Sequence, residues 1–113
     1  DDPQLSAHAR NLISDQGNII VTSAASAWEI ATKHRLGKLS IGVQAIARFN
    51  ELIELDGFEH LPITYLHALR AGSYAADHRD PFDRMLAAQS ALENLPLITC
   101  DSAFAAFGSQ VVW

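Results

Sequence analysis

The sequence predicts an α/β fold, in which a central and mostly parallel sheet is flanked by helices. Short β-branched runs alternate along the chain with longer segments whose apolar residues recur every three or four positions. These two spacings are typical of buried strands and of amphipathic helices, respectively. Strands that alternate with helices favour parallel pairing, because each helix carries the chain back across the sheet. We expect one domain over residues 1–113, which is enough chain to bury a hydrophobic core.

Capping and turn residues set the boundaries of the elements expected in the first half of the chain. Ser6 is a candidate N-cap for the first helix, and the Gly17-Asn18 turn ends it before a β-branched run. Ser23 is placed to cap the next helix, which Gly37 stops. The elements expected here are a helix over 5–13, a buried strand over 19–22, a helix over 23–36 with its apolar face at Ala24, Ala27, Trp28, Ala31 and Leu36, and a helix over 43–55.

The second half contains the clearest helix start in the chain. Asp80 is a suitable N-cap, Pro81 suits the first helical position, and Asp83 takes the third. Thr64 can cap the helix before it. The elements expected here are a strand over 58–63, a helix from Thr64 to the polar break at 77–79, a helix from Pro81 to about Glu93, a strand over 97–99, a short helix over 101–107 and a strand over 111–113.

Composition excludes several classes of protein. No apolar run reaches the roughly 18 residues of a membrane span, and no charged and apolar leader marks a signal peptide. The single Cys100 lacks a disulfide partner and a zinc-like spacing to other cysteines or paired histidines. We therefore expect a cytoplasmic protein with no membrane partner and no structural zinc. Surface positions are expected for the five histidines, which are His8, His34, His60, His67 and His78.

Three carboxylates near strand-to-helix junctions are candidates for a metal site. Glu29 lies in the helix after the first strand, Asp83 in the first turn after Pro81, and Asp101 directly after the strand over 97–99. Open α/β sheets build ligand crevices at such junctions. Clustered carboxylates repel one another unless a hard cation such as Mg²⁺ or Mn²⁺ lies between them, and such cations usually serve phosphoryl chemistry.

Each of these acids also has a purely structural interpretation. Asp83 can complement a helix dipole, Asp101 can act as an N-cap, and Glu29 can point to solvent. The cap and ligand roles can coexist. His78 and Arg79, which directly precede Asp80, are either a loop or a phosphate contact.

The net charge of −5 argues against a protein that binds nucleic acid through phosphate neutralisation alone. A bound cation would offset this charge locally. A basic cluster soon after Glu29 can line an entry groove, or it can simply complement the end of a helix. Its members are Lys33, His34, Arg35 and Lys38.

Six short motifs together resemble a known family. They are Asp-Asp-Pro-Gln-Leu-Ser from Asp1, Ser-Ala-Ala-Ser-Ala-Trp-Glu-Ile-Ala-Thr-Lys from Ser23, Arg-Leu-Gly-Lys-Leu from Arg35, Leu-Pro-Ile-Thr from Leu61, His-Arg-Asp-Pro-Phe-Asp-Arg-Met-Leu-Ala-Ala-Gln from His78 and Leu-Ile-Thr-Cys-Asp-Ser-Ala-Phe from Leu97. In order and spacing they resemble PIN domains, and specifically the VapC-type ribonuclease toxins of bacterial toxin-antitoxin pairs.

The resemblance implies a three-layer PIN-like sandwich and a metal-dependent endoribonuclease that uses Mg²⁺ or Mn²⁺. The acidic metal-site residues that it implies are Glu29, Asp83 and Asp101. Asp80 would be a neighbouring acid, and Thr99 or Ser23 would give polar support. The partners that it implies are an RNA substrate, a cognate antitoxin that neutralises the toxin, and a second copy of the chain in a homodimer.

The chain departs from the family pattern at its start. Members begin with a strand that ends in Asp, whereas this chain starts at Asp1, so we expect an N-terminally incomplete domain without its first central strand. Loss of that strand, between those over 19–22 and 97–99, would leave a gap of roughly 10 Å with unpaired backbone groups. We therefore expect that the native protein contains the missing segment, or that another chain fills the gap.

Two other functions remain open from the sequence. One is a non-catalytic, truncated PIN-like interaction module that lacks one metal ligand. The other is a metallohydrolase that acts on small phosphate esters, since the same carboxylates would serve it.

Overall fold

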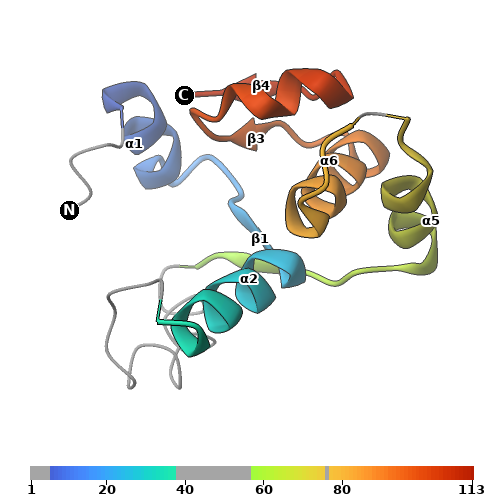
Figure 1. Ribbon diagram of the computed structural model, residues 1–113. Coiled ribbons are helices and arrows are strands. Elements are labelled where there is room, and N and C mark those ends of the chain that lie inside the picture. The colour runs from blue at the N-terminus through green and yellow to red at the C-terminus, as the bar shows by residue number, and fades with distance from the viewer. Residues whose placement is uncertain (1–5, 38–56, 76) are drawn as a thin grey trace. The chain divides into compact units, whose positions relative to one another are not determined.

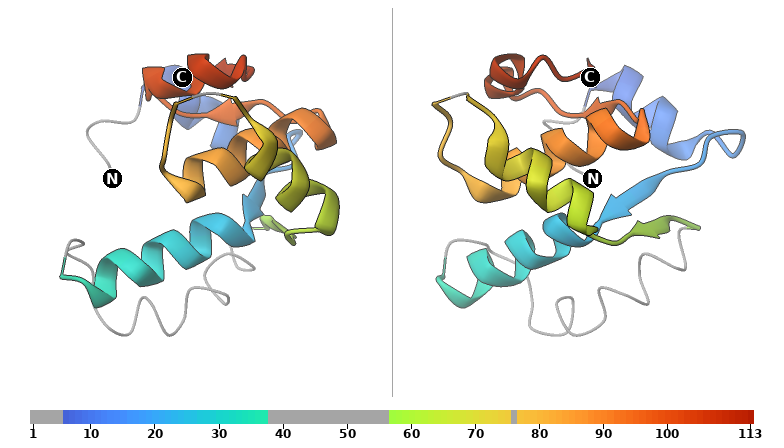
Figure 2. Two further views of the ribbon diagram at one scale, coloured as in Figure 1. Left: turned by 45° about the vertical axis from the view of Figure 1, so that its right-hand side comes forward. Right: turned by 90° about the vertical axis from the view of Figure 1, so that its right-hand side faces the viewer.

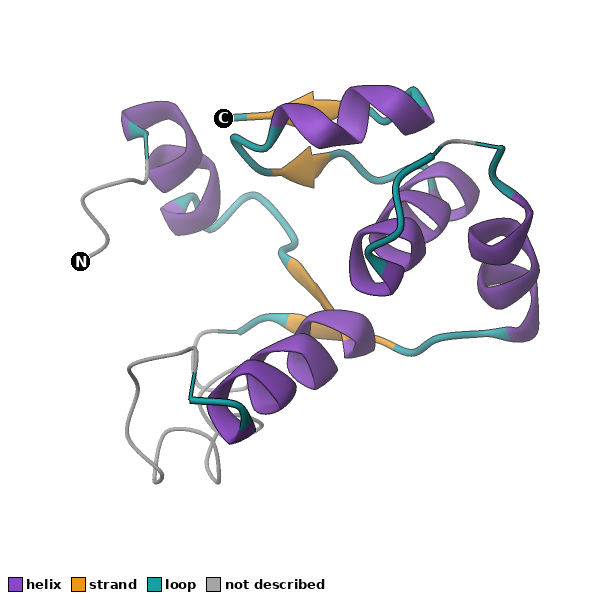
Figure 3. Cartoon of the chain, in the orientation of Figure 1, coloured by secondary structure: helices purple, strands orange, loops and turns teal. Residues whose placement is uncertain are grey.

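The computed structural model describes residues 6–37, 57–75 and 77–113 (Figure 1). The chain divides into two compact units, one formed by Asp1–Asn18 with Thr64–Trp113 and the other by Ile19–Ile63. The described part of each unit contains a two-stranded parallel sheet, and helices alternate with strands along the chain (Figure 3). The α/β prediction is therefore confirmed.

In the Ile19–Ile63 unit, a helix follows a strand without an intervening loop. Strand β1 (Val21–Ser23) pairs in parallel with β2 (Glu59–Leu61), and helix α2 (Ala24–Arg35) starts at the next residue after β1. Ser23 makes this possible because it ends the strand and its Oγ accepts the N–H of Ala25 at 2.9 Å, as the N-cap of α2. The cap expected from the sequence is confirmed.

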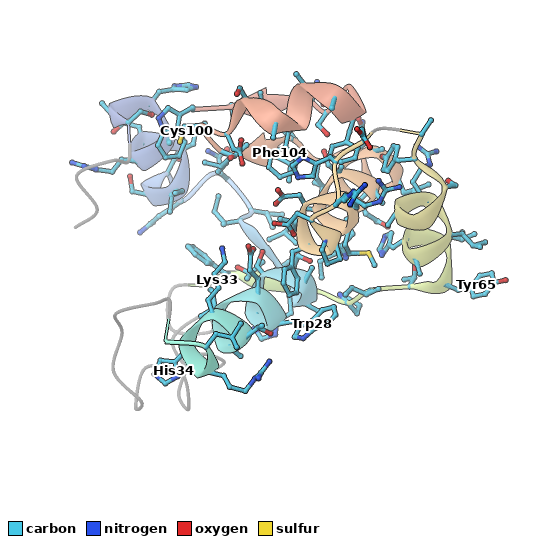
Figure 4. The ribbon with its side chains drawn as sticks, viewed as in Figure 1. Trp28, Lys33, His34, Tyr65, Cys100 and Phe104 are labelled. Carbon is cyan, nitrogen blue, oxygen red and sulfur yellow. The ribbon has the colours of Figure 1, made fainter. Side chains whose placement is uncertain are left out.

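The face of α2 that is covered differs from the expected one. Ala25 is fully buried, whereas Trp28 and Leu36 of the predicted apolar face are 59% and 52% exposed (Figure 4). Ile19, expected in a buried strand, is also exposed and lies before β1. Apolar spacing alone did not reveal which face of α2 is covered. The predicted helix over 43–55 lies outside the described residues.

The other unit contains most of the helices described. Its elements are α1 (Ala7–Ser14), α5 (Tyr65–Ser73), α6 (Pro81–Glu93), β3 (Leu97–Ile98), the 3-10 helix η1 (Ser102–Phe107) and β4 (Val111–Val112). β3 and β4 pair in parallel. Ser6, Thr64 and Asp80 are the N-caps of α1, α5 and α6, as the sequence predicts. Among the helices in the described part of the chain, none is long and apolar enough to cross a membrane.

Helices α5 and α6 of this unit lie side by side (Figures 1 and 2). Both helices bury small residues, namely Ala71 of α5 and Ala87 and Ala88 of α6. Small side chains let two helix backbones approach closely, but they bury little apolar area each. Polar contacts at both ends of the pair add to this packing.

His67 joins the start of α5 to the end of α6. Its side chain is only 1% exposed, and its Nδ1 accepts the backbone N–H of Thr64 at 3.0 Å, which completes a capping box. The ring proton must then be on Nε2, which donates to Oε2 of Glu93 at 2.8 Å. The expectation that all histidines lie at the surface is therefore wrong for His67. Its ring is buried in the seam between α5 and α6, where it takes part in the cap of α5.

Arg84 joins the opposite ends of the same two helices. Its guanidinium donates from Nε to the carbonyl of Ala71 at 2.9 Å and from Nη2 to that of Tyr74 at 2.7 Å. Nη1 donates to the carbonyl of His78 at 2.9 Å. Carbonyls at the end of a helix have no partner within the helix and carry the negative end of its dipole, so a cation is well placed there. Arg84 thus caps α5 from a neighbouring helix and fixes the segment that leads into α6.

Replacing Arg84 with methionine should lower the free energy of unfolding by about 3 kcal/mol, because several carbonyls lose a charged donor at once. Arg84→Lys should recover only part of the lost stability, since one ammonium group cannot reach the carbonyls at the end of α5 and that of His78 at once. The measurement is urea unfolding followed by circular dichroism. Arg70→Met, at an exposed arginine of α5, is the matched control and should change stability by less than about 0.5 kcal/mol. Equal effects of the two methionine variants would contradict this account of Arg84.

Replacing His67 with leucine should lower the free energy of unfolding by about 2 to 3 kcal/mol, because the N–H of Thr64 loses its acceptor inside the seam. Glu93→Gln should cost less than about 1 kcal/mol, since the carboxylate is partly exposed and the amide oxygen can still accept. Thermal and urea unfolding measure both. His60→Leu, at an exposed histidine of β2, is the control, and a loss as large as that of His67→Leu would count against the seam role.

Candidate active site

The start of α6 brings two carboxylates together. Asp80 is the N-cap, and its Oδ1 accepts the N–H groups of Phe82 at 2.9 Å and Asp83 at 3.3 Å. One carboxylate oxygen of Asp80 and one of Asp83 lie within 4.8 Å of each other. Two negative groups this close repel, and the positive end of the α6 dipole offsets part of that repulsion. The helix start predicted from Asp80 and Pro81 therefore also places the two acids as neighbours.

Asp83 is held by a histidine from the preceding segment. Its side chain is 16% exposed, and its Oδ2 lies 2.8 Å from Nε2 of His78. A carboxylate only accepts hydrogen bonds when it is ionised, so His78 is the donor. The sequence identified His78 only as a loop residue or a phosphate contact. The sequence does show that His78 lies five residues before Asp83. The bend of the chain that brings the two side chains together depends on contacts with residues outside 78–83, which the sequence does not show.

Aromatic residues and Arg84 hold His78 in turn. Its ring and that of Phe107 of η1 form a T-shaped pair, with a centroid distance of 5.4 Å and an interplanar angle of 78°. Phe107 also contacts Tyr74, with a centroid distance of 4.9 Å. Since Arg84 binds the carbonyl of His78, both the backbone and the ring of this residue are fixed. Sequence reasoning did not assign Phe107 or Tyr74 to the site.

Asp101 occupies a second helix start in the same unit. Its Oδ1 accepts the N–H of Ala103 at 2.9 Å as the N-cap of η1, and its own N–H donates to Oγ1 of Thr99 at 3.0 Å. The cap interpretation of Asp101 is thus confirmed, and Thr99 supports its backbone. Asp101 is exposed. Phe104, one turn later and labelled in Figure 4, is buried. A capping carboxylate uses one oxygen for the cap, and a second oxygen is compatible with a further ligand.

Glu29 and Ser23 belong to the Ile19–Ile63 unit. Glu29 is in α2, with its side chain 19% exposed and Oε2 2.8 Å from Nζ of Lys33, one helical turn later. Lys33 is one of the basic residues in the last turn of α2. Ser23 is buried and its Oγ serves the N-cap, so its part in the structure is to join β1 to α2.

The donor atoms of these residues suit a hard divalent cation. Carboxylate oxygens are the ligands that Mg²⁺ and Mn²⁺ prefer, and the neighbouring acids Asp80 and Asp83 would gain from a positive charge between them. The hydrogen bond from His78 limits the rotation of the Asp83 carboxylate, as hydrogen-bond partners of metal ligands do. The acids at the start of α6 therefore fit the metal chemistry that the sequence predicts.

Replacing Asp80 with alanine should lower the free energy of unfolding by about 1 kcal/mol, because α6 loses its N-cap. Asp80→Asn should leave stability within about 0.5 kcal/mol of the original, since the amide oxygen still accepts and the repulsion with Asp83 is reduced. Urea unfolding of both variants tests this. The interpretation of Asp80 as a cap is wrong if both variants lose the same amount of stability.

Comparison with known proteins gives one family match. A family model described as PIN domain matches residues 1–109, which is nearly the whole chain. No curated protein and no solved structure gives a significant match. PIN domains are generally metal-dependent nucleases. The chain therefore belongs to the PIN domain family.

Proposed function

We propose that the protein is a metal-dependent endoribonuclease of the VapC type, a toxin that cleaves RNA and is neutralised by a cognate antitoxin. The observation that carries the proposal is the family match over residues 1–109, in which the acids Asp80 and Asp83 stand side by side at the start of α6. The finer assignment to the VapC type rests on the motifs around Glu29, Asp83 and Asp101. An RNA substrate, a homodimer and a cytoplasmic location belong to the same proposal.

In this proposal Glu29, Asp83 and Asp101 hold one or two Mg²⁺ or Mn²⁺ ions. When bound, such ions orient and activate a water for attack on a phosphodiester and offset the negative charge that develops there. The contribution of the protein is to fix the positions of the carboxylates before a cation binds. His78 orients Asp83, and the N-cap and Thr99 fix Asp101.

The other residues assigned to the site have supporting roles. Asp80 caps α6 and adds negative charge beside Asp83, which increases the attraction for a cation. Lys33 pairs with Glu29, and this ion pair restrains the position of the carboxylate. Ser23 holds the start of the helix that carries Glu29.

Replacing Asp83 or Asp101 with asparagine should abolish RNA cleavage while the fold is retained. The size and shape of the side chain are kept, but each change removes a negative charge that the cation needs. Cleavage is measured on single-stranded RNA with added Mn²⁺ by the full-length protein, and circular dichroism checks the fold. The isosteric control is Asp15→Asn, in the turn after α1, where the amide oxygen can still accept the N–H of Gly17. This control should cleave at the original rate.

Two results would contradict the proposal. Cleavage by Asp83→Asn at the original rate, after removal of contaminating nuclease, would show that Asp83 is not part of the catalytic centre. Failure of the unchanged protein to take up Mn²⁺ in a calorimetric titration would instead favour the non-catalytic interaction module.

A further inference from the structure

We propose that His78 is a positioning residue for Asp83 and that it sets the affinity of the metal centre through this carboxylate. The inference rests on the proposed function to the extent that Asp83 is a metal ligand. It adds a residue that lies outside the acidic set and that the family match does not assign. His78 would not touch the substrate or the cation, and its effect would pass through Asp83 alone.

The hydrogen bond between the two side chains is the first step of the argument. Nε2 of His78 and Oδ2 of Asp83 are 2.8 Å apart, which is a short and charge-assisted contact. The side chains of His78 and Asp83 are 24% and 16% exposed, so water competes only weakly for the bond. A carboxylate can accept a hydrogen bond through one oxygen and bind a cation through the other, and such a partner limits the rotation of the carboxylate.

The second step is that His78 cannot easily follow a moving carboxylate. Its carbonyl accepts from Nη1 of Arg84 at 2.9 Å, and its ring packs against that of Phe107 in a T-shaped pair. Arg84 is the next residue after Asp83 in α6, so the helix that carries the carboxylate also holds the backbone of its partner. The donor, His78, and the acceptor, Asp83, are thus both held in place through α6. A ligand fixed in this way loses less conformational freedom when a cation binds.

A packing role is the main alternative, because the ring of His78 also contacts Phe107. Two substitutions separate the two roles. His78→Phe keeps an aromatic ring against Phe107 but has no hydrogen-bond donor. His78→Gln keeps an N–H donor near the position of Nε2 but has no ring. A positioning role and a packing role therefore predict opposite outcomes for this pair.

The experiment is a calorimetric titration of the full-length protein with Mn²⁺, together with RNA cleavage measured over a range of Mn²⁺ concentrations. For His78→Phe we expect the Kd for Mn²⁺ to rise by about 10-fold to 100-fold, as is typical when the partner of a metal ligand is removed. The Mn²⁺ concentration for half-maximal cleavage should rise in parallel, and the rate at saturating Mn²⁺ should recover. His78→Gln should stay within about 3-fold of the original Kd.

The control is His8→Phe, at an exposed histidine of α1, which should leave Mn²⁺ binding unchanged. If His78→Phe proves unfolded by circular dichroism, His78→Leu tests the same loss of the donor. The inference is overturned if a folded donor-free variant binds Mn²⁺ like the original protein, or if His78→Gln loses as much affinity as His78→Phe. Absence of Mn²⁺ uptake by the unchanged protein would overturn the proposed function itself, and the inference with it.

Discussion

The contact on which the α5–α6 unit most depends is that of the Arg84 guanidinium with the carbonyls at the end of α5. A helix end leaves carbonyl groups without partners, and the C-cap of α5, Tyr74, has a φ of −58° and not the left-handed conformation that often satisfies them. Arg84 supplies the missing donors from α6 and reaches the carbonyl of His78 with the same planar group. One side chain thereby joins two helices and fixes the segment on which His78 lies.

The His67 contact complements Arg84 at the other end of the helix pair. The buried residues of the two helices include small alanines, which give little apolar area each, so polar contacts at both ends contribute to the pairing. His67 is bound through both ring nitrogens, to Thr64 and to Glu93, and this requires one defined tautomer. The acids at the start of α6 thus stand on a helix that is held at its beginning and at its end.

Local signals made much of this structure predictable. The caps at Ser6, Ser23, Thr64 and Asp80 were predicted because each depends on a side chain and an N–H two or three residues away. The α/β class followed from spacing, and the acids Asp80 and Asp83 became neighbours because they share one helix start. Contacts between residues far apart in the sequence could not be predicted, because a single sequence does not show which distant residues meet.

The burial of His67 and the partners of Arg84 and His78 illustrate this limit. His67 meets Glu93 from 26 residues away, and Arg84 meets Ala71 from 13. The exposure of Trp28 was missed for a related reason, because the apolar spacing of α2 does not state which of its faces distant residues cover. The assignment of Glu29, Asp83 and Asp101 as metal ligands stays a prediction that rests on the family resemblance.

Asp83 and Arg84 are adjacent residues of one helix, and their side chains leave the axis about 100° apart. Asp83 is the proposed metal ligand, and Arg84 joins α6 to the end of α5. A shift of α6 by a single residue would bring Met85 to the end of α5 and turn the carboxylate away from His78. The contacts of Arg84 with the end of α5 therefore set the register of α6, and this register decides where the carboxylate of Asp83 lies.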